Sequence, residues 1–333
     1  MKWATKNVGM NTVLEKYNKY QTIGERFPLE EYGYFFESDL NSRNTWERKT
    51  VSSILKDNQK RYVSTTFTED ESYNRFLKIS QFLKKQQAIH PEIEEIYPNL
   101  KTVVCNYVGE FLPTLLLSED RYAALDAISD YVNFLCNISP KKAIFSIPYL
   151  VERFLKLAEQ VPEILPFISE TAKALPIISK KGLHFSYGFG IGDPDMNNFR
   201  VVKNMGVMQA LTTDYGYWSD RVNYHWALGY FYSSLRWLTK TCPKSSIQCE
   251  DYLLTKVIKN GIDDEFMFWF GVLTGYCGYV GVIEKALIKD ELERFQSQLD
   301  IIKELDTKVS LLAEQLIANE GEPEFSALNA AIA

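Results

Sequence analysis

The chain has 333 residues, of which 46% are hydrophobic and 14% aromatic, and this is enough apolar material to bury a full core in two lobes. The formal net charge of −6 is confined to the end of the chain, because residues 1–283 carry 32 basic and 32 acidic side chains, whereas residues 284–333 carry 5 and 11. A uniformly acidic protein would repel nucleic acid, but a neutral body with an acidic tail neither supports nor excludes an RNA ligand.

The N-terminal residues 1–45 are predicted to form an arm with one short helix near 11–21. The first residues have no long apolar core, so they do not have the pattern of a signal peptide. Five cysteines, an odd number without a CxxC pair, predict free and mostly buried thiols in a reducing compartment.

Residues 46–117 are predicted to form an N-terminal helical lobe. Its best-marked helix follows Asp70, a residue that can cap a helix start, and has an apolar stripe at helical spacing. The stripe consists of Phe76, Ile79, Phe82 and Leu83. The opposite face carries basic side chains that form either a solvated surface or a ligand-binding surface, namely Arg75, Lys78, Lys84 and Lys85.

Residues 118–283 are predicted to form a C-terminal helical lobe. Prolines at 98, 140 and 162 stand where helices could begin, and segments such as 120–138 show helical periodicity. No alternation of apolar and polar residues is long enough to predict a sheet. We therefore expect an all-α fold of two helical lobes with a cleft between them, plus N- and C-terminal arms.

The segment 266–283 has no charged residue over 18 positions, and it contains the GxxxG pair Gly271 and Gly275. This length is the lower limit for a membrane span, and the glycines would suit close helix contact in lipid. The other interpretation is a helix buried inside the protein or against a neighbouring subunit, which the mean hydropathy of −0.21 favours.

Residues 284–333 are predicted to form a long amphipathic helix followed by an acidic tail. Such a helix needs a partner surface, and we expect its apolar side to mediate oligomerisation. That side consists of Leu292, Phe295, Leu299, Ile302, Val309, Leu312 and Leu316.

Known catalytic and metal-binding patterns are absent from the sequence. The run GFGIG (188–192) is GxGxG rather than GxGxxG and has no Rossmann unit around it, which indicates a tight turn between helices. The run DPDMNN (193–198) has the first three ligand positions of a calcium loop but lacks its glycine and its final glutamate. The histidines at 90, 184 and 225 form no zinc cluster. These observations predict no catalytic residues, no metal, no cofactor and no enzymatic activity.

Basic and aromatic residues do alternate around the glycine run. Cations can follow phosphates while aromatic rings stack on bases, so this composition fits a groove for single-stranded nucleic acid as well as an ordinary core. The residues considered for such a groove are Lys180, Lys181, Tyr187, Arg200 and Lys203, together with Lys84 and Lys85 from the first lobe.

The region 145–235 resembles the nucleoproteins of non-segmented negative-strand RNA viruses, in their paramyxovirus and bornavirus forms. A leucine-rich segment, FLKLAEQVPEILPFI, leads to SYGFGIG (186–192), which is similar to the paramyxovirus SYAMGVG motif. Asn204-Met205-Gly206 and the aromatic run 214–229 follow in the family's order. The chain departs from the family at Pro176, Lys181 and Val207, where the family has aromatic residues or an arginine.

The resemblance implies a viral nucleoprotein that encapsidates single-stranded RNA without sequence specificity in a basic cleft. It also implies a ring or helical homo-oligomer, a phosphoprotein or polymerase cofactor bound by the acidic tail, and a place in the virion nucleocapsid and the host-cell interior, without secretion. Two other readings stay open. One is a soluble all-α protein-binding (immunity or adaptor) protein, and the other is a membrane-active protein that inserts 266–283.

Overall fold

The computed structural model describes residues 35–39, 50–56, 60–67, 69–215, 218–239, 242–257, 261–281, 283–284 and 292–319. The chain divides into two compact units, Met1–Gly109 and Glu110–Ala333. The sequence-based division instead placed the end of the first lobe at residue 117. Most of the predicted N-terminal arm lies outside the described residues, apart from a short strand at 35–39.

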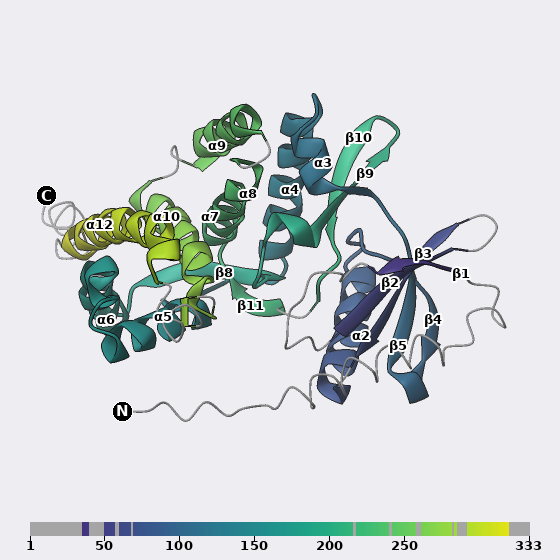
Figure 1. The fold of residues 1–333 in the computed structure, drawn as a ribbon, viewed down its shortest axis with the longest axis horizontal. Coiled ribbons are helices and arrows are strands. Elements are labelled where there is room, and N and C mark those ends of the chain that lie inside the picture. The colour runs from purple at the N-terminus through teal and green to yellow at the C-terminus, as the bar shows by residue number, and fades with distance from the viewer. Residues whose placement is uncertain are drawn as a thin grey trace, which may run out of the picture. The chain divides into compact units, whose positions relative to one another are not determined.

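Unit 1 is built on a five-stranded antiparallel sheet with the strand order β1-β2-β3-β5-β4, and one helix, α2, follows β3 in the chain (Figure 1). The strands are β1 Phe35–Asp39, β2 Thr50–Lys56, β3 Arg61–Phe67, β4 Ile93–Tyr97 and β5 Thr102–Asn106. Helix α2 spans Asp70–Lys85 and buries Tyr73 and Phe76 against Phe67 of β3, with ring centroids 5.9 and 5.3 Å apart. Of the apolar stripe predicted for this helix, Phe76, Ile79 and Leu83 are buried and Phe82 is half-buried.

Unit 2 contains two three-stranded antiparallel sheets among its helices. The strand order of the first is β10-β9-β6, and that of the second is β11-β8-β7. The strands are β6 Glu110–Phe111, β7 Lys141–Ile144, β8 His184–Ile191, β9 Phe199–Asn204, β10 Val207–Thr212 and β11 Trp218–Val222. The helices are α3 Leu112–Leu116, α4 Arg121–Cys136, α5 Tyr149–Gln160, α6 Ser169–Lys181, α7 Tyr224–Ser234, α8 Arg236–Thr239, α9 Pro243–Val257, α10 Ile262–Cys277 and α12 Gln296–Asn319.

The all-α prediction is therefore wrong, and the missed strands share a physical cause. Strands β2 and β3 are rich in serine and threonine on both faces, so apolar alternation is weak, although cross-strand pairs such as Thr66 and Thr102 bond through their hydroxyls at 2.8 Å. The proline rule failed at Pro140, which precedes strand β7, whereas Pro98 begins the short 3₁₀ helix Pro98–Leu100.

The glycine run 188–192 lies largely in strand β8, not in a turn between helices. A Cβ atom on Gly188 would lie 1.7 Å from the carbonyl oxygen of Cys136, so glycine is needed where β8 crosses the end of α4. The Asn204-Met205-Gly206 step is the turn of the β9–β10 hairpin, with φ of 49° at Met205 and 83° at Gly206. Two of the motifs behind the nucleoprotein resemblance, the glycine run and the Asn204-Met205-Gly206 step, thus serve β-structure.

The apolar segment 266–283 is a buried element of unit 2. Helix α10 packs against α7 and α12, and Phe266, Phe268 and Phe270 have no exposed surface. Within the part of the chain that the structure describes, no helix is both long and apolar enough to cross a membrane. The cysteine prediction is also confirmed in its structural part, because all five are free and four are buried.

Helix α12 has its partner within the chain, so the expectation that it lacks one is wrong. It packs against α10 and α6, and five of the seven predicted apolar positions are buried there. These are Leu299, Ile302, Val309, Leu312 and Leu316. Phe295 is half-buried, and the side chain of Leu292 lies outside the described part of the structure.

A buried carboxylate fastens α12 to α6. Asp306 is 2% exposed, and its two oxygens accept the backbone N–H groups of Glu170 (3.1 Å) and Thr171 (2.7 Å) at the start of α6. The carboxylate therefore accepts from two N–H groups that have no partner inside the helix. Its negative charge also lies at the positive end of the helix dipole, where it is stabilising.

Replacing Asp306 by alanine is expected to destabilise the protein by about 2 kcal/mol, because it leaves two buried N–H groups unsatisfied. Urea unfolding followed by circular dichroism measures this loss. Asp300→Ala is the control, because Asp300 lies on the same helix but is exposed. Equal losses for the two variants would contradict the fastening role.

Candidate active site

The loop between β8 and β9 is held in one conformation by its own side chains. Asp195 starts a 3₁₀ turn at Met196–Asn198, where its Oδ1 accepts hydrogen bonds from the backbone N–H (2.9 Å) and the side-chain amide (2.6 Å) of Asn197. Met196 is buried, and its N–H donates to the Ser234 hydroxyl of α7 at 3.1 Å. The loop is thus attached to the helical core beneath it.

Asn198 connects the two ends of this region. Its Nδ2 donates to the carbonyl oxygen of Asp193 at 2.8 Å, which fixes the amide plane. Its own carbonyl oxygen accepts from the Thr212 hydroxyl (3.1 Å) and the Thr213 N–H (3.0 Å), just after β10. The hairpin β9–β10 therefore returns the chain to the loop where it started.

Asp214 lies at this return point. Its N–H donates to the Thr212 hydroxyl at 3.3 Å, and its carbonyl oxygen accepts from the Trp218 indole N–H at 3.0 Å. The charge of Asp214 reaches the Asp193 carboxylate, where it contributes to a pKa shift. Asp193, Asn198 and Asp214 thus form one cluster, called the loop cluster below.

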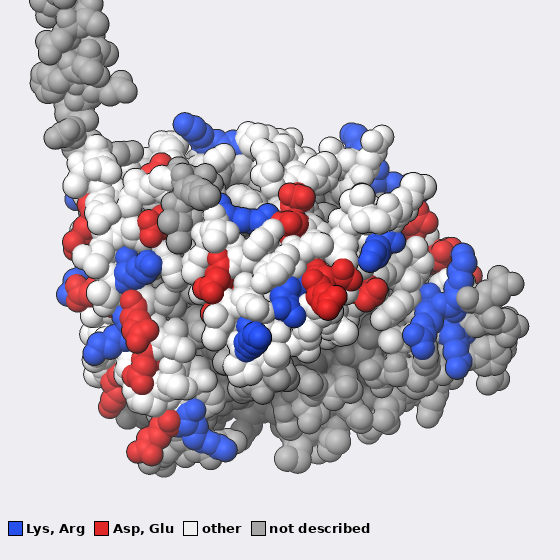
Figure 2. All heavy atoms as spheres, turned by 90° about the horizontal axis from the view of Figure 1, so that it is seen from above, with Lys and Arg blue, Asp and Glu red and all other residues white. Residues whose placement is uncertain are grey.

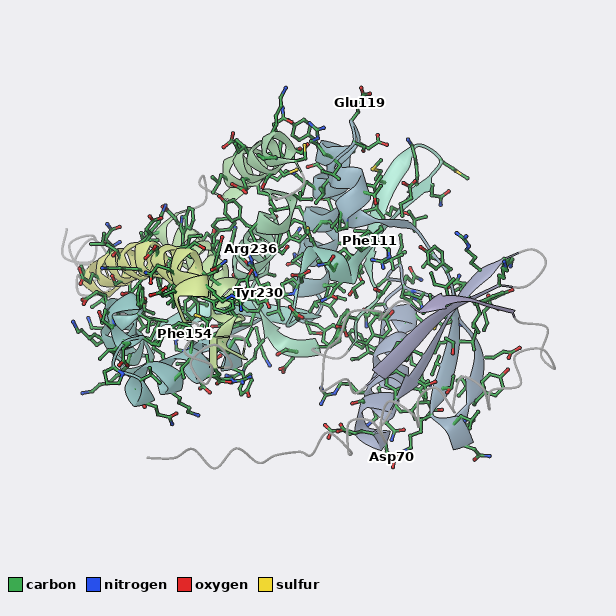
Figure 3. All side chains as sticks on the ribbon, in the orientation of Figure 1. Asp70, Phe111, Glu119, Phe154, Tyr230 and Arg236 are labelled. Atoms are coloured by element: carbon green, nitrogen blue, oxygen red, sulfur yellow. The ribbon has the colours of Figure 1, made fainter. Side chains whose placement is uncertain are left out.

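Asp193 is a carboxylate with unusual titration. Burial raises its pKa to about 6, and the charges of Asp195 and Asp214 add to the rise, whereas hydrogen bonds from Tyr230 and Asn198 oppose it. Burial and the neighbouring Asp193 hold the pKa of Tyr230 well above its ordinary value, so the phenol stays protonated and donates to the carboxylate. Tyr230 lies on α7 in the middle of unit 2 (Figure 3). The site thus contains a carboxylate that is ionised near neutral pH and held by a buried tyrosine.

Tyr230→Phe is expected to raise the pKa of Asp193 by about one unit, because a hydrogen bond to a charged group contributes about 1.5 kcal/mol and one pKa unit corresponds to about 1.4 kcal/mol. Titration of ¹³Cγ-labelled aspartate by NMR measures the shift, with Asp193→Asn assigning the resonance. Tyr224→Phe serves as the control, since Tyr224 lies on the same helix and bonds to Ser129 instead. An unchanged or lowered pKa in Tyr230→Phe would contradict the role assigned to this hydroxyl.

The loop cluster fits a magnesium ion shared with phosphate groups. Its donors are a carboxylate and an amide oxygen, the hard oxygen ligands that Mg²⁺ prefers, and the bond from Asn198 Nδ2 leaves its Oδ1 as the ligand atom. Among the described residues, no group of three or more His, Cys, Asp or Glu side chains could hold a metal ion alone. In the usual magnesium site, one or two protein ligands are completed by phosphate and water.

The residues predicted to bind RNA are dispersed over separate elements. Lys84 and Lys85 are exposed at the end of α2 in unit 1, and Lys180 is exposed at the end of α6. Lys181 donates to the carbonyl oxygen of Ile317 (3.0 Å) in α12. Tyr187 is buried in β8, where its ring cannot receive a base.

The two β9 residues also have local partners. The Arg200 guanidinium lies 4.6 Å from the ring centroid of Phe111, and Lys203 lies 3.9 Å from the carboxylate of Asp120. Basic and acidic side chains are interspersed over the face seen in Figure 2. His225, for which the sequence predicts no metal site, pairs with Asp264 at 2.9 Å.

Sequence reasoning missed all three members of the loop cluster, although it considered the stretch 193–198 as a calcium loop. The available signal was an aspartate followed five positions later by an asparagine, then a hairpin and a second aspartate. Protein kinases have this spacing in their catalytic loop, followed by the aspartate of the DFG motif. The glycines and the resemblance drew attention to the strand before the loop instead.

No protein-family model and no curated protein matches the sequence, whereas solved structures match most of the chain. Aminoglycoside phosphotransferase APH(4)-Ia superposes with a TM-score of 0.57 at 12% identity, covering 86% of this chain and 99% of that one. A choline/ethanolamine kinase family protein from Mesorhizobium loti superposes with a TM-score of 0.53 at 12% identity, covering 92% and 96%. Both likenesses extend over both units.

Two further structures of a thermostable APH(4)-Ia mutant, each 10% identical, superpose with TM-scores of 0.52 and 0.50. In one, an aspartate is replaced by alanine in a ternary complex with ADP and hygromycin B. In the other, an asparagine five positions later is replaced in a complex with AMP-PNP and hygromycin B.

These likenesses overturn the identification as a viral nucleoprotein. The same finding overturns the predicted partners, which were single-stranded RNA, a ring or filament of the protein itself and a phosphoprotein. The exclusion of an enzyme is overturned too, since the proteins sharing the fold are a phosphotransferase and a kinase family member, and neither alternative reading gains support. The chain has the fold of aminoglycoside phosphotransferase and the choline/ethanolamine kinase family protein.

Proposed function

We propose that the protein is a phosphotransferase that moves the terminal phosphoryl group of a nucleoside triphosphate to a hydroxyl group of a small molecule. The observation that carries the proposal is the loop cluster, in which Asp193, Asn198 and Asp214 occupy the order and spacing of the catalytic and metal-binding residues of kinases. The relatives that share the fold act on small molecules according to their names.

Each residue of the loop cluster has a role in this reaction. Asp193 would orient the acceptor hydroxyl and take its proton, and a pKa of about 6 leaves it ionised for this at neutral pH. Asn198 Oδ1 and the Asp214 carboxylate would hold magnesium, which would neutralise negative charge on the phosphate groups. Tyr230 would keep the Asp193 carboxylate in place.

Unit 1 departs from kinases at one position that matters. Kinases carry a phosphate-binding lysine on strand β3, but β3 here reads RYVSTTF and contains no lysine. The residues between β1 and β2 (40–49) also lack the glycines of a phosphate-covering loop. These departures favour a second candidate function, a protein that binds nucleotide through unit 2 and does not transfer phosphate.

The test is to incubate the protein with [γ-³²P]ATP and magnesium and to measure bound nucleotide, ADP formation and transfer to a panel of small alcohols and amino alcohols. The proposal expects ADP formation that requires magnesium and falls in Asn198→Ala and Asp214→Asn. Magnesium-dependent binding without ADP would support the second candidate. An absence of nucleotide binding both with and without magnesium would refute both candidate functions.

A further inference from the structure

A cavity of about 580 Å³ lies in unit 2, and no residue of the loop cluster lines it. Residues of α7, α8, α9, α10 and α12 line it, and four of the lining side chains are aromatic: Tyr232, Trp269, Tyr276 and Tyr279. Volumes of 300–1,000 Å³ with aromatic walls and a few charged groups are typical of small-molecule sites. The cavity is therefore large enough for a ligand with a flat ring.

The chain's own cations already occupy the aromatic faces of this cavity. The Arg236 guanidinium lies 4.8 Å from the ring centroid of Tyr276 and 4.6 Å from that of Tyr279. The Lys308 ammonium lies 3.6 Å from the ring centroid of Trp269. A cationic ligand would have to displace these groups to gain a cation–π contact, and their charges would repel it.

Lys308 lacks a compensating carboxylate. Partial burial lowers its pKa, and only the charge of Glu265 acts in the opposite direction. Within the described parts of the chain, no carboxylate oxygen lies within 4.0 Å of its ammonium nitrogen. An anionic group bound beside Lys308 would supply the missing charge.

The acidic residues of the cavity give little stabilisation to a bound cation. Burial raises the pKa of Glu250, and this carboxylate already accepts a hydrogen bond from the Ser246 hydroxyl at 2.8 Å. Glu304 is exposed, as is Lys308 one turn later on the same helix, so water and salt screen both of these charges. The preference for an anion over a cation therefore comes from the ring faces, which the chain's own cations already occupy.

We propose that this cavity binds small organic anions, carboxylates or phosphate esters attached to a flat apolar body, with Lys308 and Arg236 as the anionic group's partners. Figure 3 shows Arg236 and Tyr230 close together, and the positive charge of Arg236 opposes the rise of the Tyr230 pKa. Tyr230 in turn donates a hydrogen bond to Asp193, so the pair Arg236 and Tyr230 connects the cavity with the loop cluster.

The experiment compares probes that share one ring and differ in charge. Isothermal titration calorimetry of the full chain without nucleotide measures the binding of benzoate, phenyl phosphate and benzylamine. We expect saturable binding of both anions below about 10 mM and binding of benzylamine that is weaker by about tenfold or more. Benzylamine binding as tight as benzoate, or no binding of either anion, would overturn the proposal.

Two variants on α12 locate the site. Lys308→Gln removes the charge beside Trp269 and should weaken benzoate binding by about tenfold. Lys303→Gln removes an exposed charge from the same helix and should leave it unchanged. Equal effects of the two variants would place the bound anion elsewhere and overturn the assignment. Circular dichroism confirms folding, and because no nucleotide is present, the result stands whether or not phosphoryl transfer is found.

Discussion

Replacing Asp193 by asparagine is expected to lower the rate of magnesium-dependent ADP formation by about 10²–10⁴-fold, the contribution typical of a general base. Asparagine keeps the shape of the side chain and can still contact Tyr230, but it cannot accept a proton from an acceptor hydroxyl. The measurement is ADP release under saturating nucleotide. The control is Asp220→Asn, an exposed carboxylate on β11 that pairs with Lys141.

The same substitution separates catalysis from stability. The folded-state pKa of Asp193 is raised, so its protonated form contributes stability that is fully present below the unfolded pKa of about 3.8 and is lost as pH rises through about 6. At pH 8 the folded wild type therefore contains an ionised carboxylate whose burial is destabilising, and asparagine removes that charge. We expect Asp193→Asn to be more stable by about 1–2 kcal/mol at pH 8, after allowing for partial exposure, and by much less at pH 4.

Urea unfolding of both proteins at pH 4, 6 and 8 tests this dependence. A stability difference that grows from pH 4 to pH 8 supports the raised pKa. A variant that loses activity and is also less stable at pH 8 would show that Asp193 supports the fold rather than the reaction, and it would weaken the proposed function.

Gly271→Ala is expected to destabilise the protein by about 3 kcal/mol or more, because inserting atoms into a close-packed contact forces the backbone to move. A Cβ atom there would lie 2.1 Å from the carbonyl oxygen of Trp226 on α7, and the partner helix has the reciprocal contact, where a Cβ on Gly229 would lie 1.9 Å from the carbonyl oxygen of Phe268. The two helices thus meet backbone to backbone. Thermal and urea unfolding measure the loss.

Gly281→Ala is the matched control in the same apolar segment. The nearest atom to its added Cβ is an Arg153 guanidinium nitrogen at 3.6 Å, an ordinary contact with a flexible side chain. We expect a neutral or slightly stabilising effect, since alanine favours a helix by about 1 kcal/mol over glycine. If Gly271→Ala were tolerated equally well, the close approach of α7 and α10 would be contradicted.

The sequence by itself determined the local helices and the burial of the cysteines. The stripe of α2 and the segment 120–138, which contains α4, have strong helical periodicity, and 3.6-residue spacing depends only on neighbours along the chain. It also restricted the uncharged segment 266–283 to a buried helix or a membrane span. It did not reveal the sheets, because Ser/Thr-rich strands such as β3 and glycine-rich β8 are stabilised by partners far along the chain.

Only the tertiary structure decided why the glycines are present and where the site lies. Gly188 and Gly271 are required by backbones from other elements, a contact that no local pattern records. Asp193 and Asp214 are 21 positions apart and become neighbours because β9 and β10 form a hairpin between them. The raised pKa of Asp193 depends on burial and on Tyr230 from α7. Sequence reasoning considered the stretch 193–198 only as an incomplete calcium loop and did not consider Asp214, because the proximity of these residues is a property of the fold.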